Sequence, residues 1–578
     1  MERSRTFTTT MVLAIFVASC TPRSPAPPAP DEPVFFADES ISLGYETRAA
    51  LSTDAAFEVQ LPEAARLGFA IATREPADAV RFRIRADDAV VFDETLATKD
   101  GNHWWDQEPI DLSEWAGDDV ELVFETDGAG LWGNPRIETR APEGPHVILI
   151  SIDCLRADHV GTYGYSKPTT PSIDGFAHNA VVFDNAVSAS SWTIPSHMSM
   201  FTGLPPMVHG VNDSPDNFWA GTAKTLPPSV PYLAELLSRH GYETGAVVSS
   251  APMSPLYGFE RGFGVYRVHA DKAEEVVDSA LDLVARSHQR PFFLFVHFID
   301  PHWPYMPMVE FRSYAAEFIE RFGDRPRDIS ELIKRHQGKA VKALPEDAVD
   351  IQTLYDAALA YVDRELGRFF TELKRQGIYD DALILLTGDH GEGFYDHETF
   401  GHAKTLYQEL THVPLIVKWP RGASSGRVDA PVSHVDIFPT ILEAAGLTAP
   451  PAEGVSQASA PSDREIVGDA SWEDRLRSET MLSVRRGRYK YIAAIPFAPF
   501  EELSLEALIS EELYDLASDP KEAHNLIEEP PIPLAPFRER LETYLSAAKL
   551  YRAGHEGGAI ALDEDTRRSL EALGYISR

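Results

Sequence analysis

Four short segments of this chain carry carboxylate, imidazole or hydroxyl side chains in patterns that suit metal-assisted chemistry. Each follows an apolar run or opens a helix-like stretch, and the members are Asp153, Thr193, Asp300 with His302, and Asp389 with His390. Carboxylates and imidazoles together suit a divalent cation such as Zn, Mn or Ca. A hydroxyl at a helix start lies among unpaired amides, where an anionic group is stabilised. Taken singly, Thr193 also fits a plain helix cap, and each aspartate fits a strand-end cap.

The elements before these residues predict how the chain positions them. Continuous apolar runs, typical of central parallel strands covered on both faces, occur at 146–152, 244–248, 291–298, 382–386 and 413–417. Helical patterns, for example at 230–239 and 352–375, separate them, and this alternation predicts an α/β sheet. Ligands of such sheets bind at the carboxyl ends of the strands. The four polar segments are therefore expected at one edge of one sheet, which favours the chemical interpretation over separate caps.

The composition limits the function classes. The chain has 578 residues, of which 44% are hydrophobic and 24% charged, as in ordinary globular proteins. Its formal net charge of -37 argues against nucleic acid as a partner, and against a membrane surface bound through basic patches.

The N-terminus reads as an export signal. Arg3 and Arg5 precede an apolar core at 11–17 that is too short to span a bilayer. The following residues, 17–20, resemble the lipobox of bacterial lipoproteins, which implies lipidation at Cys20 and a place in the bacterial cell envelope, on its periplasmic side or outer surface. A soluble secreted protein is the alternative. The proline-rich residues 21–33 fit a spacer. Cys154 is the only other cysteine, so no structural disulfide is expected.

Residues 34–142 have a different pattern of polar and apolar residues. Stretches such as 81–85 and 119–125 alternate polar and apolar residues between turn signals, which predicts a β-sandwich. The domain resembles carbohydrate-binding jelly rolls, and its tryptophans suit either a sugar-stacking platform or, for most of them, the sandwich core; they are Trp104, Trp105, Trp115 and Trp132.

The motifs of the α/β part resemble those of the sulfatase family, within the alkaline phosphatase superfamily. The resemblance lies in residues 150–165 with 170–174, in 387–392, and in the later landmarks 432–442 and 513–522. It covers about residues 145–530. It implies a sulfatase-like mixed sheet flanked by helices, and a divalent cation held by Asp153, Asp389, His390 and Thr193.

One departure from the family pattern matters most. Sulfatases carry Cys or Ser in Cys/Ser-x-Pro-x-Arg, which is oxidised to formylglycine. Here Thr193-Ile194-Pro195-Ser196-His197 stands in that place, with Thr for the nucleophile and His for Arg. A Thr nucleophile resembles the family's phosphodiesterases and phospho-group transferases. The family's double aspartate is Asp153-Cys154 here, so one calcium ligand is missing and the metal stays open among Ca, Mn and Zn.

The resemblance also suggests roles for the remaining polar residues. His302 is a candidate general acid or substrate contact. His402 falls near the family's substrate lysine, where it would bind the ester anion or a second metal. His209 is a weaker candidate beside a turn. Further candidate substrate contacts are His197, Lys404 and Asp300.

The predicted domains are a signal at 1–20, a linker at 21–33, the sandwich at 34–142, a catalytic domain at 145–450, and a smaller α+β subdomain at 451–578. A charged insertion at 306–350, with helices at 309–322 and 329–337, is expected to form a lid or wall. The sequence thus predicts a lipid-anchored, metal-dependent hydrolase of an anionic phosphate, phosphonate or sulfate ester, on a glycan or lipid headgroup. A phospho-headgroup transferase and a catalytically silent glycan-binding lipoprotein remain alternatives.

Overall fold

The computed structural model describes most of residues 33–561. The gaps are 38, 76, 99–102, 139–140, 213–221, 250, 270–271, 288–289, 304, 306–311, 323–344, 459–460, 462, 474–477 and 556–558. The predicted signal, the Cys20 lipidation site and the predicted second insertion helix at 329–337 lie outside the described residues. No helix among the described residues is both long and apolar enough to cross a bilayer.

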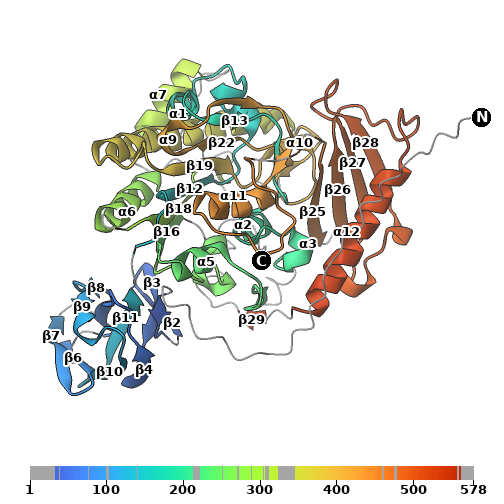
Figure 1. Ribbon diagram of the computed structural model, residues 1–578. Coiled ribbons are helices and arrows are strands. Elements are labelled where there is room, and N and C mark those ends of the chain that lie inside the picture. The colour runs from blue at the N-terminus through green and yellow to red at the C-terminus, as the bar shows by residue number, and fades with distance from the viewer. Residues whose placement is uncertain are drawn as a thin grey trace, which may run out of the picture.

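A mixed sheet forms the centre of the molecule (Figure 1). Its parallel strands are β12 (Val147–Ile152), β16 (Glu243–Ser249), β17 (Val265–His269), β18 (Phe292–Phe298) and β19 (Leu383–Gly388). Beyond β19 the sheet turns antiparallel through β22 (Leu415–Lys418), which pairs with β13 (Val181–Phe183), and β23 (Gly426–Val428) forms the edge. Every residue of β12, β18 and β19 is buried, as the continuous apolar runs predict. The predicted α/β fold is confirmed.

Helices cover both faces of this sheet (Figure 1). One face packs Ile148 and Ile150 against α1 (Pro171–Ala177), α6 (Ala273–Arg286), α7 (Arg312–Phe322) and α9 (Ala348–Arg375). The other packs Val147 and Leu149 against α2 (Thr193–Thr202), α3 (Pro206–His209), α5 (Leu233–Arg239) and α11 (Ile437–Ala444). Successive β12 residues thus enter opposite cores, as the two-residue period of a strand requires. Helix α7 occupies the first predicted insertion helix.

The N-terminal region folds as two facing antiparallel sheets. One contains β4 (Ala55–Gln60), β6 (Ala77–Ala86), β7 (Ala89–Thr98) and β10 (Asp119–Thr126). The other contains β2 (Glu39–Leu43), β3 (Glu46–Leu51), β5 (Arg66–Thr73) and β11 (Gly130–Glu138), with the short β1 (Val34–Phe35), β8 (Trp105–Asp106) and β9 (Ile110–Asp111). Trp132 is fully buried in the core between them, whereas Trp104 is buried in a separate cluster with Leu131; Trp105 and Trp115 are partly exposed.

The second of these sheets continues into the central sheet. Strand β3 pairs antiparallel with β17, matching Thr47 with Tyr266 and Glu46 with Arg267. The Arg267 guanidinium donates from Nε to Glu46 Oε2 at 2.8 Å, and both side chains are buried. Among the described residues the two regions therefore share one sheet of fifteen strands.

The C-terminal part is a four-stranded antiparallel sheet with one long helix. Its strands are β25 (Glu465–Glu473), β26 (Ser478–Arg486), β27 (Tyr489–Pro496) and β28 (Ser510–Asp515), and the helix is α12 (Ala535–Ala553). In Figure 1 this sheet and α12, drawn in orange to red, lie beside the central sheet and its helices. The remaining short pieces are β14 (Ala186–Val187) with β24 (Val432–Ser433), β15 (Thr222–Lys224) with β29 (Ala559–Ala561), β20 (Gly393–Phe394) with β21 (Phe400–Gly401), and α10 (Gln408–Thr411).

Candidate active site

Thr193 is the first residue of α2, and its hydroxyl does not cap the helix. The N-cap is Trp192, in an extended conformation (φ -159°, ψ 165°), with no side-chain capping bond. Thr193 is fully buried, and its Oγ1 lies 3.3 Å from His390 Nε2. The cap interpretation of Thr193 is therefore wrong. The hydroxyl faces the polar residues that follow β12 and β19.

Those residues form a compact carboxylate–imidazole cluster. Ligand atoms of Asp153, Asp389 and His390 all lie within 4.8 Å of one another, and all three residues are fully buried. Asp389 Oδ1 accepts hydrogen bonds from the backbone amides of Cys154 (3.1 Å) and His390 (2.8 Å). His390 Nδ1 lies 2.8 Å from the Gly391 carbonyl, a bond that leaves Nε2 to face Asp153 Oδ1 at 3.6 Å and Asp389 Oδ2 at 3.4 Å.

This cluster fits a divalent cation. Asp153 Oδ2 and Asp389 Oδ2 are buried, and neither has a hydrogen-bond partner among the residues that the structure describes. Burial and then the neighbouring Asp153 charge raise the pKa of Asp389 well above its ordinary value. Two adjacent buried carboxylates repel one another, and a cation between them removes that cost. The donor set of two carboxylates, an imidazole and a hydroxyl suits Mn, Zn or Ca, as the sequence predicts.

A second group of side chains, formed by His402, Glu392 and Tyr305, lies next to the cluster. His402 Nδ1 lies 3.1 Å from Glu392 Oε1, and the Tyr305 hydroxyl donates to Glu392 Oε2 at 2.8 Å. Burial raises the pKa of Glu392, but His402, His302 and the Tyr305 hydroxyl together outweigh burial and lower that pKa. Burial likewise opposes protonation of His402, yet Glu392 raises the pKa of His402. The pair therefore favours a charged imidazolium in contact with a carboxylate.

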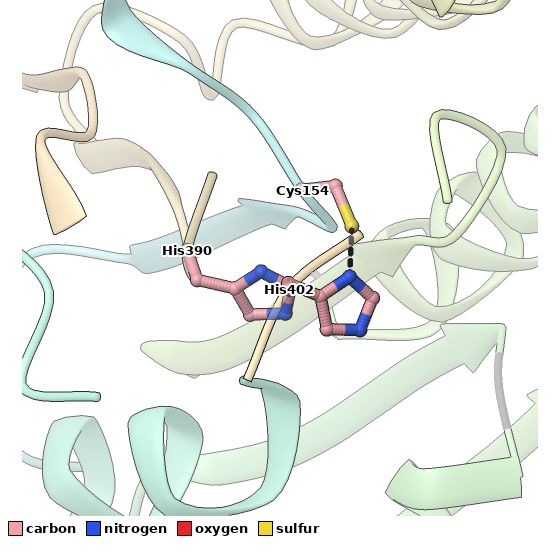
Figure 2. Close-up of side chains that lie close together, drawn as sticks. All are labelled: Cys154, His390 and His402. Carbon is pink, nitrogen blue, oxygen red and sulfur yellow. Dashed lines mark hydrogen bonds between the residues drawn. The ribbon is translucent and has the colours of Figure 1, made fainter. Parts of the chain in front are cut away.

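The three imidazoles of the site lie side by side. The ring centroid of His402 is 4.9 Å from that of His302 and 4.5 Å from that of His390. His302 is held by a 2.6 Å contact between its Nδ1 and the Trp303 carbonyl, and burial lowers its pKa. Figure 2 shows His390 and His402 with Cys154.

Two further histidines, His197 and His297, contact the residues around the cluster. His197 Nδ1 bonds the Thr193 carbonyl at 2.8 Å and its Nε2 bonds Ser151 Oγ at 2.9 Å. Burial lowers the pKa of His197 well below its ordinary value, so the ring is neutral. His297 Nδ1 bonds the Ser249 carbonyl at 3.2 Å, which turns Nε2 toward Asp153 Oδ2 at 3.6 Å. These contacts make His197 a support for the first turn of α2.

The remaining residues that the sequence singled out, Asp300, His209 and Lys404, lie outside the cluster or at its edge. Asp300 Oδ1 accepts from the Ala273 amide at 3.2 Å, at the start of α6. His209 bonds the Pro195 carbonyl at 3.2 Å, and its Nδ1 accepts from the Val211 amide at 3.1 Å. Lys404 is partly buried, and its charge acts on His402. The structure thus brings together Asp153, Thr193, Asp389, His390, His302 and His402.

Glu392 and His297 are site residues that the sequence argument does not single out. Glu392 lies within the motif 387–392, three residues after Asp389, but its type alone does not distinguish it from a surface acid. His297 carries a clearer signal, because it is the one imidazole in the otherwise apolar strand β18.

With this geometry described, comparison with known proteins identifies the family. Residues 145–447, more than half of the chain, match the family model described as sulfatase. The chain belongs to the sulfatase family. Residues 391–549 also match the model described as N-sulphoglucosamine sulphohydrolase, C-terminal. The protein is accordingly an ester hydrolase of the sulfatase family.

Individual sulfatase-family relatives are distant. A delta 4,5-hexuronate-2-O-sulfatase of Bacteroides thetaiotaomicron is 24% identical over 483 residues, which cover 76% of this chain and 95% of the relative. The solved structure of a 2-O GAG sulfatase superposes with a TM-score of 0.56 at 22% identity, covering 74% of this chain and 96% of the other. A phosphonate monoester hydrolase of Agrobacterium radiobacter superposes with a TM-score of 0.50 at 21% identity, covering 72% and 100%. At these identities the solved structures establish a shared fold.

Proposed function

We propose that this sulfatase-family enzyme hydrolyses a phosphate or phosphonate ester, with Thr193 as the nucleophile. The observation that carries the proposal is the position of the Thr193 hydroxyl, buried and 3.3 Å from His390 Nε2 beside the Asp153–Asp389 pair. A weakly acidic hydroxyl becomes a nucleophile when a neighbouring group takes its proton or stabilises its anion.

The residue type supports phosphate over sulfate. Formylglycine arises from Cys or Ser, whose β-carbon carries two hydrogens and can become an aldehyde. The β-carbon of threonine carries a methyl group, so its oxidation would give a ketone instead. Thr193 must therefore act through its own oxygen. The shared fold of the phosphonate monoester hydrolase is consistent with this substrate class.

The proposed reaction consists of two displacements at phosphorus, in which the residues of the site have separate roles. Thr193 Oγ1 loses its proton to solvent and attacks phosphorus, the bond from phosphorus to the alcohol oxygen breaks, and a phosphothreonine forms. The departing alcohol takes a proton from an imidazolium, for which His402 is suited because Glu392 raises its pKa. Water then attacks phosphorus and gives a proton to the now neutral His402, the bond from phosphorus to Thr193 Oγ1 breaks, and Thr193 regains its proton from solvent as the acid is released. A divalent cation held by Asp153, Asp389 and His390 would supply hydroxyl activation and charge neutralisation when bound.

The test compares two threonines of the same helix. Thr193→Ala should lower turnover of aryl phosphate diesters or phosphonate monoesters by at least about a thousandfold, because it removes the attacking atom. Thr202→Ala is the matched control, since Thr202 is also buried in α2 but its hydroxyl bonds backbone groups of that helix end: it donates to the Met198 carbonyl at 2.7 Å and accepts from the Leu204 amide at 3.3 Å. A quenched reaction of the wild type should yield phosphate on the peptide that contains Thr193.

Two outcomes would contradict the proposal. One is full turnover of the phosphate esters by Thr193→Ala, and the other is wild-type activity confined to aryl sulfates. Product analysis with and without an acceptor alcohol separates hydrolysis from transfer to an envelope lipid or glycan.

The natural substrate and the location form part of the same proposal. We infer an anionic ester on a glycan or lipid headgroup, on the periplasmic side or outer surface of a bacterial envelope. The lipobox-like residues at 17–20 and the glycan-active relative named above support this inference.

A further inference from the structure

The chain just before α2 is held by an edge of the C-terminal sheet. Strand β25 is the first strand of that sheet and pairs on one side with β26. On its other side, the Asp469 amide donates to the Ala189 carbonyl at 3.1 Å, and the Ser190 hydroxyl donates to the Asp469 carbonyl at 2.8 Å. Gly468 permits this approach, because a Cβ atom there would lie only 3.3 Å from the Ala189 carbonyl oxygen. Residues 188–191, here called the nucleophile loop, thus cover this edge of β25.

The nucleophile loop also contacts the catalytic cluster. The Ser188 hydroxyl donates to the Asp389 carbonyl at 2.6 Å, and the Ser191 carbonyl accepts from the Ala403 amide at 2.8 Å. Asp389 is one of the two carboxylates of the cluster, and Ala403 directly follows the imidazole proposed as general acid. A shift of the loop along β25 would therefore move the Thr193 hydroxyl relative to the groups with which it must react.

The side chain of Asp469 ties this edge strand to two helices. It is buried, and its Oδ2 accepts from the Tyr544 hydroxyl of α12, which is buried as well. The Met207 amide of α3 lies 3.3 Å from both of these oxygens. Asp469 Oδ1 has no hydrogen-bond partner among the residues that the structure describes. Burial raises the pKa of Asp469 to about 7, which reduces the charge that must be buried.

This polar contact lies within an apolar interface. Val467, two residues before Asp469, and Leu541 and Leu545, which flank Tyr544 in α12, belong to one apolar core. Apolar packing alone leaves the alignment of a strand on a helix weakly defined, whereas a buried and directed hydrogen bond can select one alignment. The bond between Asp469 and Tyr544 therefore fixes where β25 lies, and with it the two backbone groups that hold the nucleophile loop.

We propose that Asp469 and Tyr544 are positioning residues for the reaction at Thr193. Their bond holds β25 at the alignment in which its edge keeps the nucleophile loop, and hence the Thr193 hydroxyl, beside His390. Neither residue touches the substrate, so both act on the chemical step through the backbone at 189–190. The inference rests on the proposed function for the role of Thr193 as nucleophile.

The experiment compares two tyrosines of the C-terminal part in the full-length chain. Tyr544→Phe keeps the ring and removes the bond to Asp469. It should lower kcat by about tenfold and leave KM within about twofold, because displacing an attacking atom slows the chemical step more than binding. Tyr491→Phe is the matched control and should keep the wild-type kcat. Tyr491 is also buried and its hydroxyl also donates to a carboxylate, that of Glu511, but this bond lies within the C-terminal sheet.

Two further measurements separate positioning from general stability. Asp469→Asn retains an oxygen that accepts from Tyr544 and should keep kcat within about threefold, whereas Asp469→Ala should lose about as much as Tyr544→Phe. Hydrogen exchange in peptides covering 187–193 and 465–473 should be faster in Tyr544→Phe than in the wild type, and unchanged in Tyr491→Phe.

Three outcomes would overturn the proposal. They are a wild-type kcat in Tyr544→Phe, an equal loss of kcat in Tyr544→Phe and Tyr491→Phe, and an Asp469→Asn kcat as low as that of Asp469→Ala. If Asp469→Ala does not fold, the two tyrosine variants decide. The assay uses whichever ester, phosphate or sulfate, the wild type turns over. Failure of the proposed function would appear as wild-type activity confined to aryl sulfates and would leave this comparison intact.

Discussion

The hairpin between Glu392 and His402 depends on one ion pair that can be tested directly. His397 lies in the turn of β20 and β21, where its Nδ1 bonds Glu409 Oε1 at 2.7 Å and its Nε2 bonds the Glu522 carbonyl at 3.1 Å. The ring also stacks on Tyr407, with centroids 3.8 Å apart and an interplanar angle of 13°. His397→Phe keeps the stacking and removes both hydrogen bonds and the charge.

The size of the effect follows from the pKa of His397. Burial lowers that pKa, but the interactions with Glu409 and Glu522 together outweigh burial and raise it from 6.5 to about 9. One pKa unit corresponds to about 1.36 kcal/mol, which gives a ceiling of about 3.4 kcal/mol. The site is partly exposed, so solvent screening reduces the expected contribution to about 2 kcal/mol. Because the folded pKa is the higher one, this stability is complete below pH 6.5 and is lost as the pH rises through about 9.

Hydrogen exchange of the hairpin amides measures this contribution, because local opening exposes them without global unfolding. At about pH 6, His397→Phe should exchange about 30-fold faster than the wild type in the peptides covering 393–401. At about pH 10 the ratio should fall to about threefold, since the wild type has lost its imidazolium. His555→Phe is the matched control: His555 also stacks on a tyrosine, Tyr551, but its Nδ1 bonds a backbone carbonyl. A ratio that does not change with pH would refute the reasoning.

Three further predictions concern the site and the anchor. Removing metal with a chelator should lower the thermal midpoint by several degrees, because Asp153 and Asp389 are left as adjacent buried carboxylates. Adding metal back should restore the midpoint. In the same melting assay, the chelator should shift the midpoint of Asp389→Asn by less than that of the wild type. Glu392→Gln should lower kcat on phosphate esters by about 10- to 100-fold, because His402 loses a charge-assisted hydrogen bond; an unchanged rate would exclude the pair from the reaction. Cys20→Ser should move the protein from the membrane to the soluble fraction of the expressing cells, whereas unchanged fractionation would contradict the lipobox.

The central strands could be predicted because burial on both faces leaves an unbroken apolar run, as in β12, β18 and β19. Strand direction could not, because a run of apolar residues reads the same in both directions; β22 is antiparallel despite its similar composition. The edge location of Asp153, Asp389 and His390 followed from the strand ends.

Other parts of the site depend on contacts that the sequence does not encode locally. The position of the Thr193 hydroxyl depends on the extended backbone of Trp192, which the sequence pattern of a helix start does not specify. The pairing of Glu392 with His402 depends on the short β20–β21 hairpin that brings two segments back together. His297 reaches Asp153 only because its strand lies next to β12.

The pairing of β3 with β17 has a consequence for any shortened form of the chain. A protein that began near Pro145 would lack β3, and the backbone groups of β17 that pair with Glu46 and Thr47 would become an open sheet edge. Open edges recruit strands from other molecules, so such a protein is prone to self-association. It would also leave Arg267 buried without Glu46. The N-terminal sandwich therefore covers an edge of the central sheet, and the catalytic part is expected to need it for a stable, monomeric fold.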